Sequence, residues 1–277
     1  MDDKEFKLIK EVAATVAKES YQDVGRPVLE PTGKTLALLP RTIKASLLPL
    51  EKWVLRREYN LAETEKMLEQ KLQNVNPDQI SAPEVYIGVP ALQYISYCMD
   101  SKELRDMYAE LLAKSMNEST RKGVHPGYVE IIKQLCPDEA KIMRVMEDVL
   151  PVITLRYANE KGRGVEILRN FSDIGEKANC EYPSNISQYI DNLERLGIIT
   201  LATPLSTLIE KSLYDPLKNH PSIKSVERRF MSLMSSEELS EYKALIDGEP
   251  LIKVVESYYK ITDFGRSFKA ICITPIT

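Results

Sequence analysis

The stretch of the chain from Pro83 to Met146 constrains the fold most, because its apolar residues recur at helical spacing with few interruptions. Residues that commonly begin helices divide this stretch: Pro83, Ser101, the pair His125–Pro126 and the pair Pro137–Asp138. An amphipathic helix must bury its apolar stripe against a neighbour. We therefore predict about four packed helices between Pro83 and Leu150.

Three of these helices have apolar stripes that follow directly from the spacing. The stripes contain Leu104, Met107, Tyr108, Leu111, Leu112 and Met116; then Val129, Ile131, Ile132 and Leu135; then Ile142, Val145 and Met146. The first of the three helices also carries acidic residues at a similar spacing, interleaved with cations. They are Asp100, Glu103, Asp106 and Glu110, between which lie Lys102 and Arg105. Such rows are usually solvated, so we expect these carboxylates to be exposed.

The composition is typical of a soluble globular protein. The chain has 277 residues, of which 43% are hydrophobic and 28% charged, enough for two domains with a core. A net charge of −4 gives no general attraction to nucleic acid. The cysteines are single and lack metal-ligand or disulfide spacing, which predicts a reducing, cytoplasmic compartment; they are Cys98, Cys136, Cys180 and Cys272. Neither a signal peptide nor a membrane-spanning run is expected.

The N-terminal part is predicted to be helical as well. Apolar residues at helical spacing favour one helix from about Asp3 to Tyr21. Another helix is expected from about Pro49 to Gln73, and Asn76–Pro77 would end it.

The segment from Lys34 to Arg57 is both apolar and basic, with six positive side chains against one negative. Two interpretations stay open. The segment could lie on an anionic membrane surface, or it could form short core helices whose lysines reach the solvent. In the first case the contacts would be Lys44, Trp53, Arg56 and Arg57.

Beyond Pro151 the sequence pattern changes. We predict, in chain order, a strand at Ile153–Ala158, a helix at Val165–Phe171, a short helix at Ser172–Ala178, a helix capped by Ser184 and ended by Gly197, strands at Ile198–Leu201 and Val254–Ile261, and a closing helix from Thr262. The order helix, turn, helix, strand, strand, helix is that of a winged helix-turn-helix. The segment between the last two strands, about 204–249, would be a partly helical insertion.

The predicted fold class is therefore mainly α. An N-terminal helical bundle at residues 1–150 would precede a C-terminal winged-helix-like α+β domain at residues 151–277, with its insertion at about 204–249.

The second helix of the winged-helix motif has two interpretations. It could read DNA, with Asn185, Gln188, Asn192 and Arg195 as contacts. However, Asp191 and Glu194 outnumber the single cation of this helix and would repel phosphate. The same four residues are therefore candidates for contact with nucleic acid or with a protein partner, and the charge favours the protein.

No catalytic site is predicted, and neither a cofactor, a metal nor a small-molecule substrate is implied. The two histidines, His125 and His220, lack an arranged nucleophile or carboxylate, and His125 is expected to make local hydrogen bonds at a helix start. The PTGKT sequence at 31–35 lacks the first glycine of a phosphate-binding loop, because position 28 is Val28. We therefore expect a protein that is not an enzyme.

Four phrases together resemble one bacterial family, the abortive infection alpha family. They are LPLEKWVLRREYNLAETEKMLEQKL (48–72), IGVPALQYISY (87–97), SKELRDMYAELLAKSMN (101–117) and VHPGYVEIIKQLCPDEAKIM (124–143). The resemblance extends from about Thr35 to the C-terminus and is strongest between Pro83 and Ile142. It implies a role in bacterial defence against phage, and no catalytic residue follows from it.

The expected function is that of a non-enzymatic anti-phage protein with a helical domain and a winged-helix domain that binds a partner. The partner would be another protein or a second copy of the chain. Two alternatives stay open: a winged-helix regulator that binds nucleic acid, and an effector that acts on a membrane surface through residues 34–57.

Overall fold

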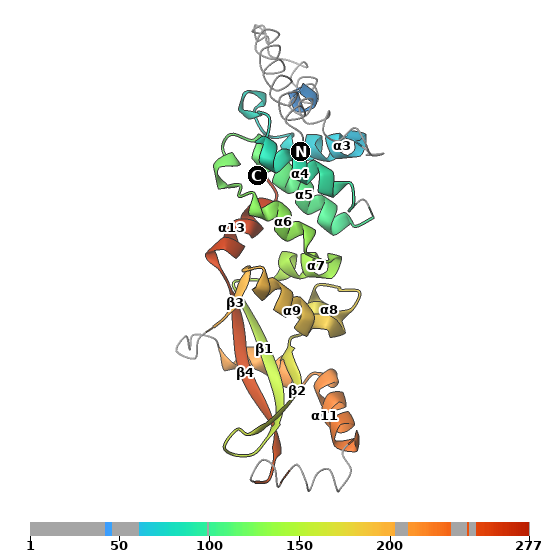
Figure 1. Ribbon diagram of the computed structural model, residues 1–277, viewed down its shortest axis with the longest axis vertical. Helices are drawn as coiled ribbons and strands as arrows, with labels where there is room; N and C mark the ends of the chain where they lie inside the picture. The colour runs from blue at the N-terminus through green and yellow to red at the C-terminus, as the bar shows by residue number, and fades with distance from the viewer. Residues whose placement is uncertain are drawn as a thin grey trace, which may run out of the picture. The chain divides into compact units, whose positions relative to one another are not determined.

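The computed structural model describes residues 42–45, 61–98, 100–202, 210–233, 243 and 248–276. The described part is mainly helical and contains a four-stranded antiparallel sheet (Figure 1). The chain divides into two compact units, residues 1–133 with 274–277 and residues 134–273. The domain division near residue 150 stays a prediction, and the helix expected at Asp3–Tyr21 lies outside the described residues.

The first unit is built of short helices. They are α3 (Leu61–Leu72), α4 (Val85–Ile95), α5 (Lys102–Met116) and α6 (Gly127–Lys133), with a helical turn at 42–45 and single turns η1 (Pro77–Gln79) and η2 (Arg121–Gly123). Helix α5 contacts α3, α4 and α6, and Figure 1 shows α4 and α5 side by side. The core of this unit therefore lies around α5.

The apolar stripe of α5 explains its central place. All six residues of the predicted stripe are at most 8% exposed, which confirms that prediction. The stripe of the following segment is buried as well, from Val129 to Leu135. Where Tyr108 is buried against α6, its hydroxyl donates to the carbonyl oxygen of Val129 at 3.3 Å. The spacing of apolar residues thus fixes both the helices and their inner faces.

The predicted helix starts are confirmed where the structure describes their caps. The Ser101 hydroxyl accepts a hydrogen bond from the Leu104 backbone N–H at 3.4 Å, which caps α5. Before α6, His125 Nδ1 accepts from the Gly127 N–H at 3.0 Å. The local role expected for His125 is therefore confirmed.

The prediction of a solvated acidic row on α5 is wrong for Glu110, whose side chain is only 2% exposed. Lys71 of α3 lies 2.5 Å from Glu110 and 2.8 Å from Asp106, and Lys114 lies 3.7 Å from Glu110. Arg105 in turn pairs with Glu63 of α3 at 2.7 Å. The spacing within α5 could not reveal this burial, because the partner cation Lys71 comes from another helix, 39 residues away in the chain.

These charges join α3 to α5. Burial by itself would lower the pKa of Lys71, but the carboxylates of Asp106 and Glu110 outweigh it and hold that pKa above its ordinary value. Since the Lys71 ammonium stays charged, the buried carboxylate of Glu110 has a positive charge beside it that compensates its own.

The second unit combines a sheet with helices. Its elements are α7 (Pro137–Val145), β1 (Val149–Ala158), β2 (Gly164–Phe171), α8 (Ile174–Lys177), η3 (Pro183–Asn185), α9 (Ile186–Arg195), β3 (Ile199–Leu201), η4 (Lys211–Tyr214), α10 (Asp215–Lys218), α11 (Pro221–Leu233), β4 (Leu251–Ile261) and α13 (Asp263–Cys272). The four helices expected between Pro83 and Leu150 are thus α4, α5, α6 and α7. Val145, at the end of α7, is 46% exposed rather than buried, because the stripe passes from Ile142 to Met146 one turn later.

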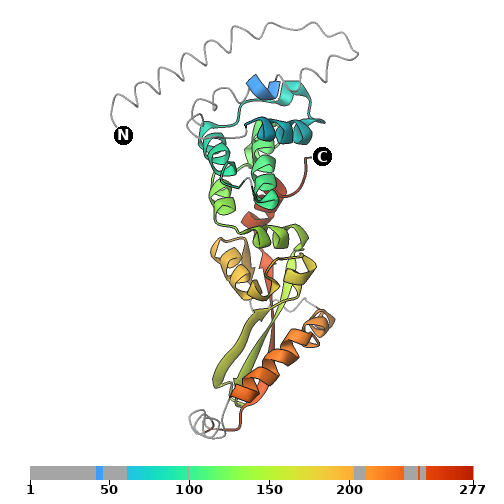
Figure 2. The same cartoon turned by 90° about the vertical axis from the view of Figure 1, so that its right-hand side faces the viewer.

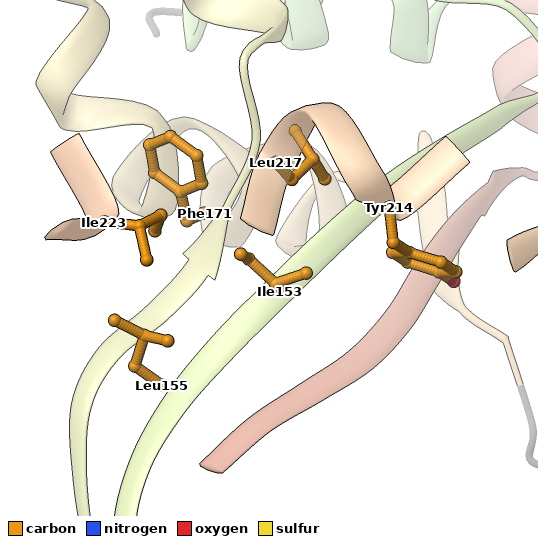
Figure 3. Packing of buried hydrophobic residues seen from close by; sticks show 6 residues of the cluster. All are labelled: Ile153, Leu155, Phe171, Tyr214, Leu217 and Ile223. Carbon is orange, nitrogen blue, oxygen red and sulfur yellow. The ribbon is translucent and has the colours of Figure 1, made fainter. Parts of the chain in front are cut away.

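The sheet has the order β2-β1-β4-β3, and all its pairs are antiparallel. β1 pairs with β4 along its whole length, from Val149 opposite Lys260 to Ala158 opposite Leu251. Helix α11 runs beside the strands (Figure 2). A core cluster joins the sheet to the segment between β3 and β4 (Figure 3); it contains Ile153, Leu155, Phe171, Tyr214, Leu217 and Ile223. The insertion between the last two strands, expected to be partly helical, therefore packs on the sheet.

The helix predicted at Val165–Phe171 is wrong, since these residues form strand β2. Asn159 Oδ1 accepts from the Arg163 N–H at 2.9 Å, and Gly162 has a φ of +80°. This tight turn folds the chain back along β1. Pairing with β1 overrides the local preference for helix, which sequence spacing alone cannot reveal.

The other elements of the second unit agree with the predicted order: α8, α9, β3, β4 and α13. Ser184, expected to cap α9, instead lies in the turn η3, and Asn185 precedes the helix. Gly197 ends α9 with a φ of +73°, as predicted. The pairing of β3 with β4 is confirmed, whereas the pairing of β4 with β1 was not part of the prediction.

One close junction joins α9, β3 and α13. The Thr262 hydroxyl donates to the Gly197 carbonyl oxygen at 2.6 Å and accepts from the Gly265 N–H at 2.8 Å. A Cβ atom at Gly265 would lie 2.1 Å from the carbonyl oxygen of Ile198. The glycine therefore permits the first turn of α13 to touch the backbone beside β3.

We expect Gly265→Ala to destabilise the second unit by about 2 kcal/mol or more, because the backbone must move to admit the methyl group. Urea unfolding followed by circular dichroism measures the change. Ser267→Ala, an exposed position in the same helix, is the control and should change the free energy of unfolding by less than about 0.5 kcal/mol. Equal stability of the two variants would contradict the argument.

Replacement of the buried carboxylate on α5 tests the α3–α5 network. Glu110→Gln should lower the free energy of unfolding by about 3 kcal/mol, because Lys71 and Lys114 lose a buried counter-charge. Glu103→Gln on the same helix, which is half-buried, should have an effect of under about 0.5 kcal/mol. Thermal and urea unfolding of both variants give the comparison, and a stable Glu110→Gln protein would refute the role of the network.

Candidate partner-binding surface

Helix α9, the second helix of the predicted winged-helix motif, buries one face and exposes the other. Ile186, Tyr189, Ile190 and Leu193 form the inner face and are at most 6% exposed. On the outer face the exposed residues are Asn185, Gln188, Asp191 and Arg195. Because the inner residues recur every three or four positions, the sequence fixes which side of α9 meets solvent.

Two of the four predicted contact residues take part in packing. The side-chain amide of Asn192 donates to Glu139 Oε1 at 2.8 Å and to the Gln134 carbonyl oxygen at 3.1 Å. Arg195 donates to Gln134 Oε1 at 3.0 Å and to Asn192 Oδ1 at 2.6 Å. These bonds tie α9 to the start of α7. Sequence reasoning missed this because the partners lie far away in the chain.

The other two predicted contact residues, Asn185 and Gln188, are exposed. Next to them Asp191 pairs with Arg169 of β2 at 3.2 Å, and both side chains are about half exposed. The outer face of α9 therefore presents the Gln188 amide, an ion pair and the already bonded Arg195, while the Asn185 amide before the helix bonds the Tyr189 hydroxyl. This face has no excess of positive charge with which to bind phosphates.

Asp138 at the start of α7 is the buried polar centre next to α9. Its carboxylate accepts from the backbone N–H groups of Glu181 and Tyr182 at 2.8 and 2.9 Å, and from the Tyr189 hydroxyl at 3.1 Å. Lys141 lies 3.0 Å from the same carboxylate. Burial opposes ionisation, but these donors outweigh it and hold the pKa of Asp138 below its ordinary value.

Two cysteines near Asp138 are poor nucleophiles. Burial raises the pKa of the Cys136 thiol, and burial together with the charge of Asp138 raises that of Cys180 to about 11. Both thiols are therefore protonated at neutral pH, and a protonated thiol neither attacks a substrate nor binds a metal well.

The second histidine also has a local role. His220 Nδ1 accepts from the Ser222 N–H at 3.3 Å at the start of α11, while Nε2 lies 3.0 Å from Glu176 Oε2. Within the described residues, no group of three His, Cys, Asp or Glu side chains is placed to hold a metal ion.

The membrane candidates fall mostly outside the described residues. Lys44 is exposed on the helical turn at 42–45, whereas Trp53, Arg56 and Arg57 lie beyond the described part. Among the helices that the structure describes, none is long and apolar enough to cross a bilayer.

Comparisons with known proteins place the chain in a family. The sequence model described as abortive infection alpha matches residues 56–272. Because the match covers most of the chain, the protein belongs to this family, which confirms the resemblance seen in the sequence. None of the curated protein sequences matches the chain. A solved structure of an uncharacterized protein from the hydrocarbon-degrading marine bacterium Alcanivorax borkumensis SK2 is similar at 16% identity, with a TM-score of 0.35, over 53% of this chain and 93% of the other.

Substitution of the buried carboxylate tests the Asp138 centre. Asp138→Asn should lower the free energy of unfolding by about 2 kcal/mol at neutral pH, because a charge-assisted acceptor becomes an amide facing N–H donors. Because the pKa of Asp138 is lower in the folded protein than in the unfolded chain, the ionised carboxylate stabilises the fold above about pH 4. This contribution to the free energy of unfolding is lost as the pH falls through the folded-state pKa. The difference in the free energy of unfolding between wild type and Asp138→Asn should therefore become smaller in acid.

Urea unfolding at neutral pH and at about pH 3 measures both effects. The control is Asp191→Asn, since its half-exposed ion pair should contribute under about 1 kcal/mol. If the difference in the free energy of unfolding between wild type and Asp138→Asn did not change with pH, the stabilising role of ionised Asp138 would be contradicted.

Proposed function

We propose that this member of the abortive infection alpha family is a non-enzymatic anti-phage protein that acts by binding a protein partner through its second unit. Family membership supports the defence role. The observation that carries the binding mode is the outer face of α9, where the exposed Gln188 amide lies beside an ion pair rather than in a basic groove.

We interpret the second unit as a winged helix, and this interpretation supports the binding mode. Helices α8 and α9 precede the paired strands β3 and β4, and α13 closes the motif through the Thr262 junction. In this fold the second helix is the usual contact element. The outer face of α9 exposes Gln188, and Asn185 is exposed immediately before the helix.

Electrostatics favour a protein over nucleic acid as the partner. Helix α9 has Arg195 as its only cation, and that side chain already binds Gln134 and Asn192. Asp191 and Glu194 lie on the same helix. Phosphate binding requires cations that are available to replace counterions, and α9 offers none. Amide side chains at an exposed position suit the polar contacts of a protein interface.

The helical first unit would then supply assembly. Its described residues contain a buried ion network that holds α3 on α5. Action on a membrane through residues 34–57 stays a separate prediction.

Plaque assays with a surface variant test the proposal. The variant Gln188→Ala should keep its fold, since this side chain is exposed, and should weaken the protection that the wild type gives against a phage panel. The matched control is Glu160→Ala with Lys161→Ala, at the exposed tip of the β1–β2 hairpin, and it should protect like the wild type. Undiminished protection by the α9 variant would refute the assigned surface.

A gel-shift titration separates the two kinds of partner. Purified wild-type protein should leave duplex DNA unshifted at low salt. A shift that weakens steeply as salt rises would instead identify a nucleic-acid regulator.

A further inference from the structure

Helix α11 packs on the sheet of the second unit through its apolar side (Figure 2). Ile223 belongs to the core cluster and is 2% exposed, and Val226 packs against that cluster. The ring of Phe230 contacts the ring of Tyr157, with their centroids 5.2 Å apart. Because these apolar residues recur at intervals of three and four, the opposite side of α11 faces solvent.

The solvent side of α11 is basic. Lys224, Arg228 and Arg229 are all exposed on it. With the residues that the structure describes, none of these three cations forms an ion pair. The Arg228 Nε–H donates to the carbonyl oxygen of Lys224 at 3.2 Å, which holds the guanidinium along the helix surface. The one carboxylate of α11, Glu227, is half-buried. Three positive charges are therefore available on this side of a helix in a chain whose net charge is −4.

Small polar side chains separate these cations into two rows. Successive residues of an α-helix lie about 100° apart around its axis. Lys224 and Arg228 therefore lie on one flank of the exposed side, and Arg229 lies on the other. Between the flanks lie Ser225 and Ser232, both exposed, and the Ser232 hydroxyl donates to the carbonyl oxygen of Arg229 at 2.8 Å. A shallow strip between charged flanks is the arrangement by which paired helices select partners of opposite charge.

We propose that this side of α11 binds an acidic helix of a protein partner. We call it the α11 basic face; it consists of Lys224, Ser225, Arg228, Arg229 and Ser232. Carboxylates on the two sides of a helix laid along the serine strip would meet the two cationic flanks, and arginine can bind a carboxylate through two parallel hydrogen bonds. The inference rests on the proposed function in that the partner is a protein, and it adds the charge of that partner.

A nucleic-acid backbone fits the α11 basic face less well. Three cations can neutralise about three phosphates, whereas salt-sensitive complexes with DNA commonly contact about six to ten. An exposed carboxylate also lies at the start of α11, where Glu176 Oε2 is 3.0 Å from Nε2 of His220 and the Glu176 side chain is 53% exposed. A strand of phosphates that continued past α11 would be repelled by this carboxylate, whereas an acidic helix can end before it.

An anionic membrane fits this face less well too. A helix that lies in a lipid surface inserts its apolar side between the lipids. The apolar side of α11 is already packed on the sheet, so only the charges would remain for lipid binding.

Fluorescence anisotropy tests the inference without phage. The probe is a labelled helical peptide with glutamates on two sides and no lysine or arginine, titrated with the full-length protein. The wild type should bind the peptide, and its affinity should fall as salt rises. Because the whole chain is net negative and would repel such a peptide, binding reports a local cluster of cations. Lys224→Gln with Arg228→Gln and Arg229→Gln should weaken binding by about tenfold or more.

The matched control removes the same charge from three separate elements of the first unit. It combines Lys66→Gln, Lys102→Gln and Lys122→Gln, at side chains that are all exposed. This variant should bind the peptide like the wild type, and circular dichroism checks that both triple variants are folded. A wild type that does not bind, or equal weakening by the two triple variants, would overturn the inference.

Two further probes distinguish the sources of negative charge. Short duplex DNA and vesicles of mixed phosphatidylserine and phosphatidylcholine are titrated in the same way. Both should bind more weakly than the acidic peptide. If either binds more tightly and loses affinity in the α11 variant, the assignment to an acidic protein is wrong.

Plaque counts then separate this inference from the proposed function. A wild type that binds the peptide through α11 but gives no protection against phage would refute the defence role and still support the α11 basic face. A wild type that protects but has no affinity for the peptide would overturn the α11 assignment alone.

Discussion

The antiparallel ladder between β1 and β4 is the constraint on which the second unit depends. Strand β4 follows β3 only after the segment that holds η4, α10 and α11, and it must return to lie between β1 and β3. The entropic cost of closing a loop rises only slowly with its length. The pairing of ten residues of β1 with β4 can therefore offset the cost of this long connection. Residues of the inserted helices then pack on β1 and β2 in one core cluster. The insertion is therefore part of the core of this unit.

Asp138 provides the polar complement to this apolar framework. A buried charge is favourable only when donors surround it, and four donors from three segments converge on this carboxylate. Loss of any one of them leaves the charge less compensated. The position of α9 beside α7 is thus fixed by directional bonds, which are stricter about geometry than apolar contact is.

Local order was predictable from the sequence, and pairing between distant residues was not. The stripe of α5 and the caps at Ser101 and His125 depend on residues within one or two turns, so spacing revealed them. Strand β2 was mistaken for a helix because its conformation depends on β1 across the hairpin. Glu110 was taken as solvated, and Asn192 and Arg195 as contacts for a partner, since the residues that they bond lie 39 to 61 positions away in the chain.

The same distinction bears on the α9 surface that we assign to binding. On α9 the polar side chains are largely satisfied within the chain, so a partner gains little energy there and its recognition must depend on the exposed Gln188 amide.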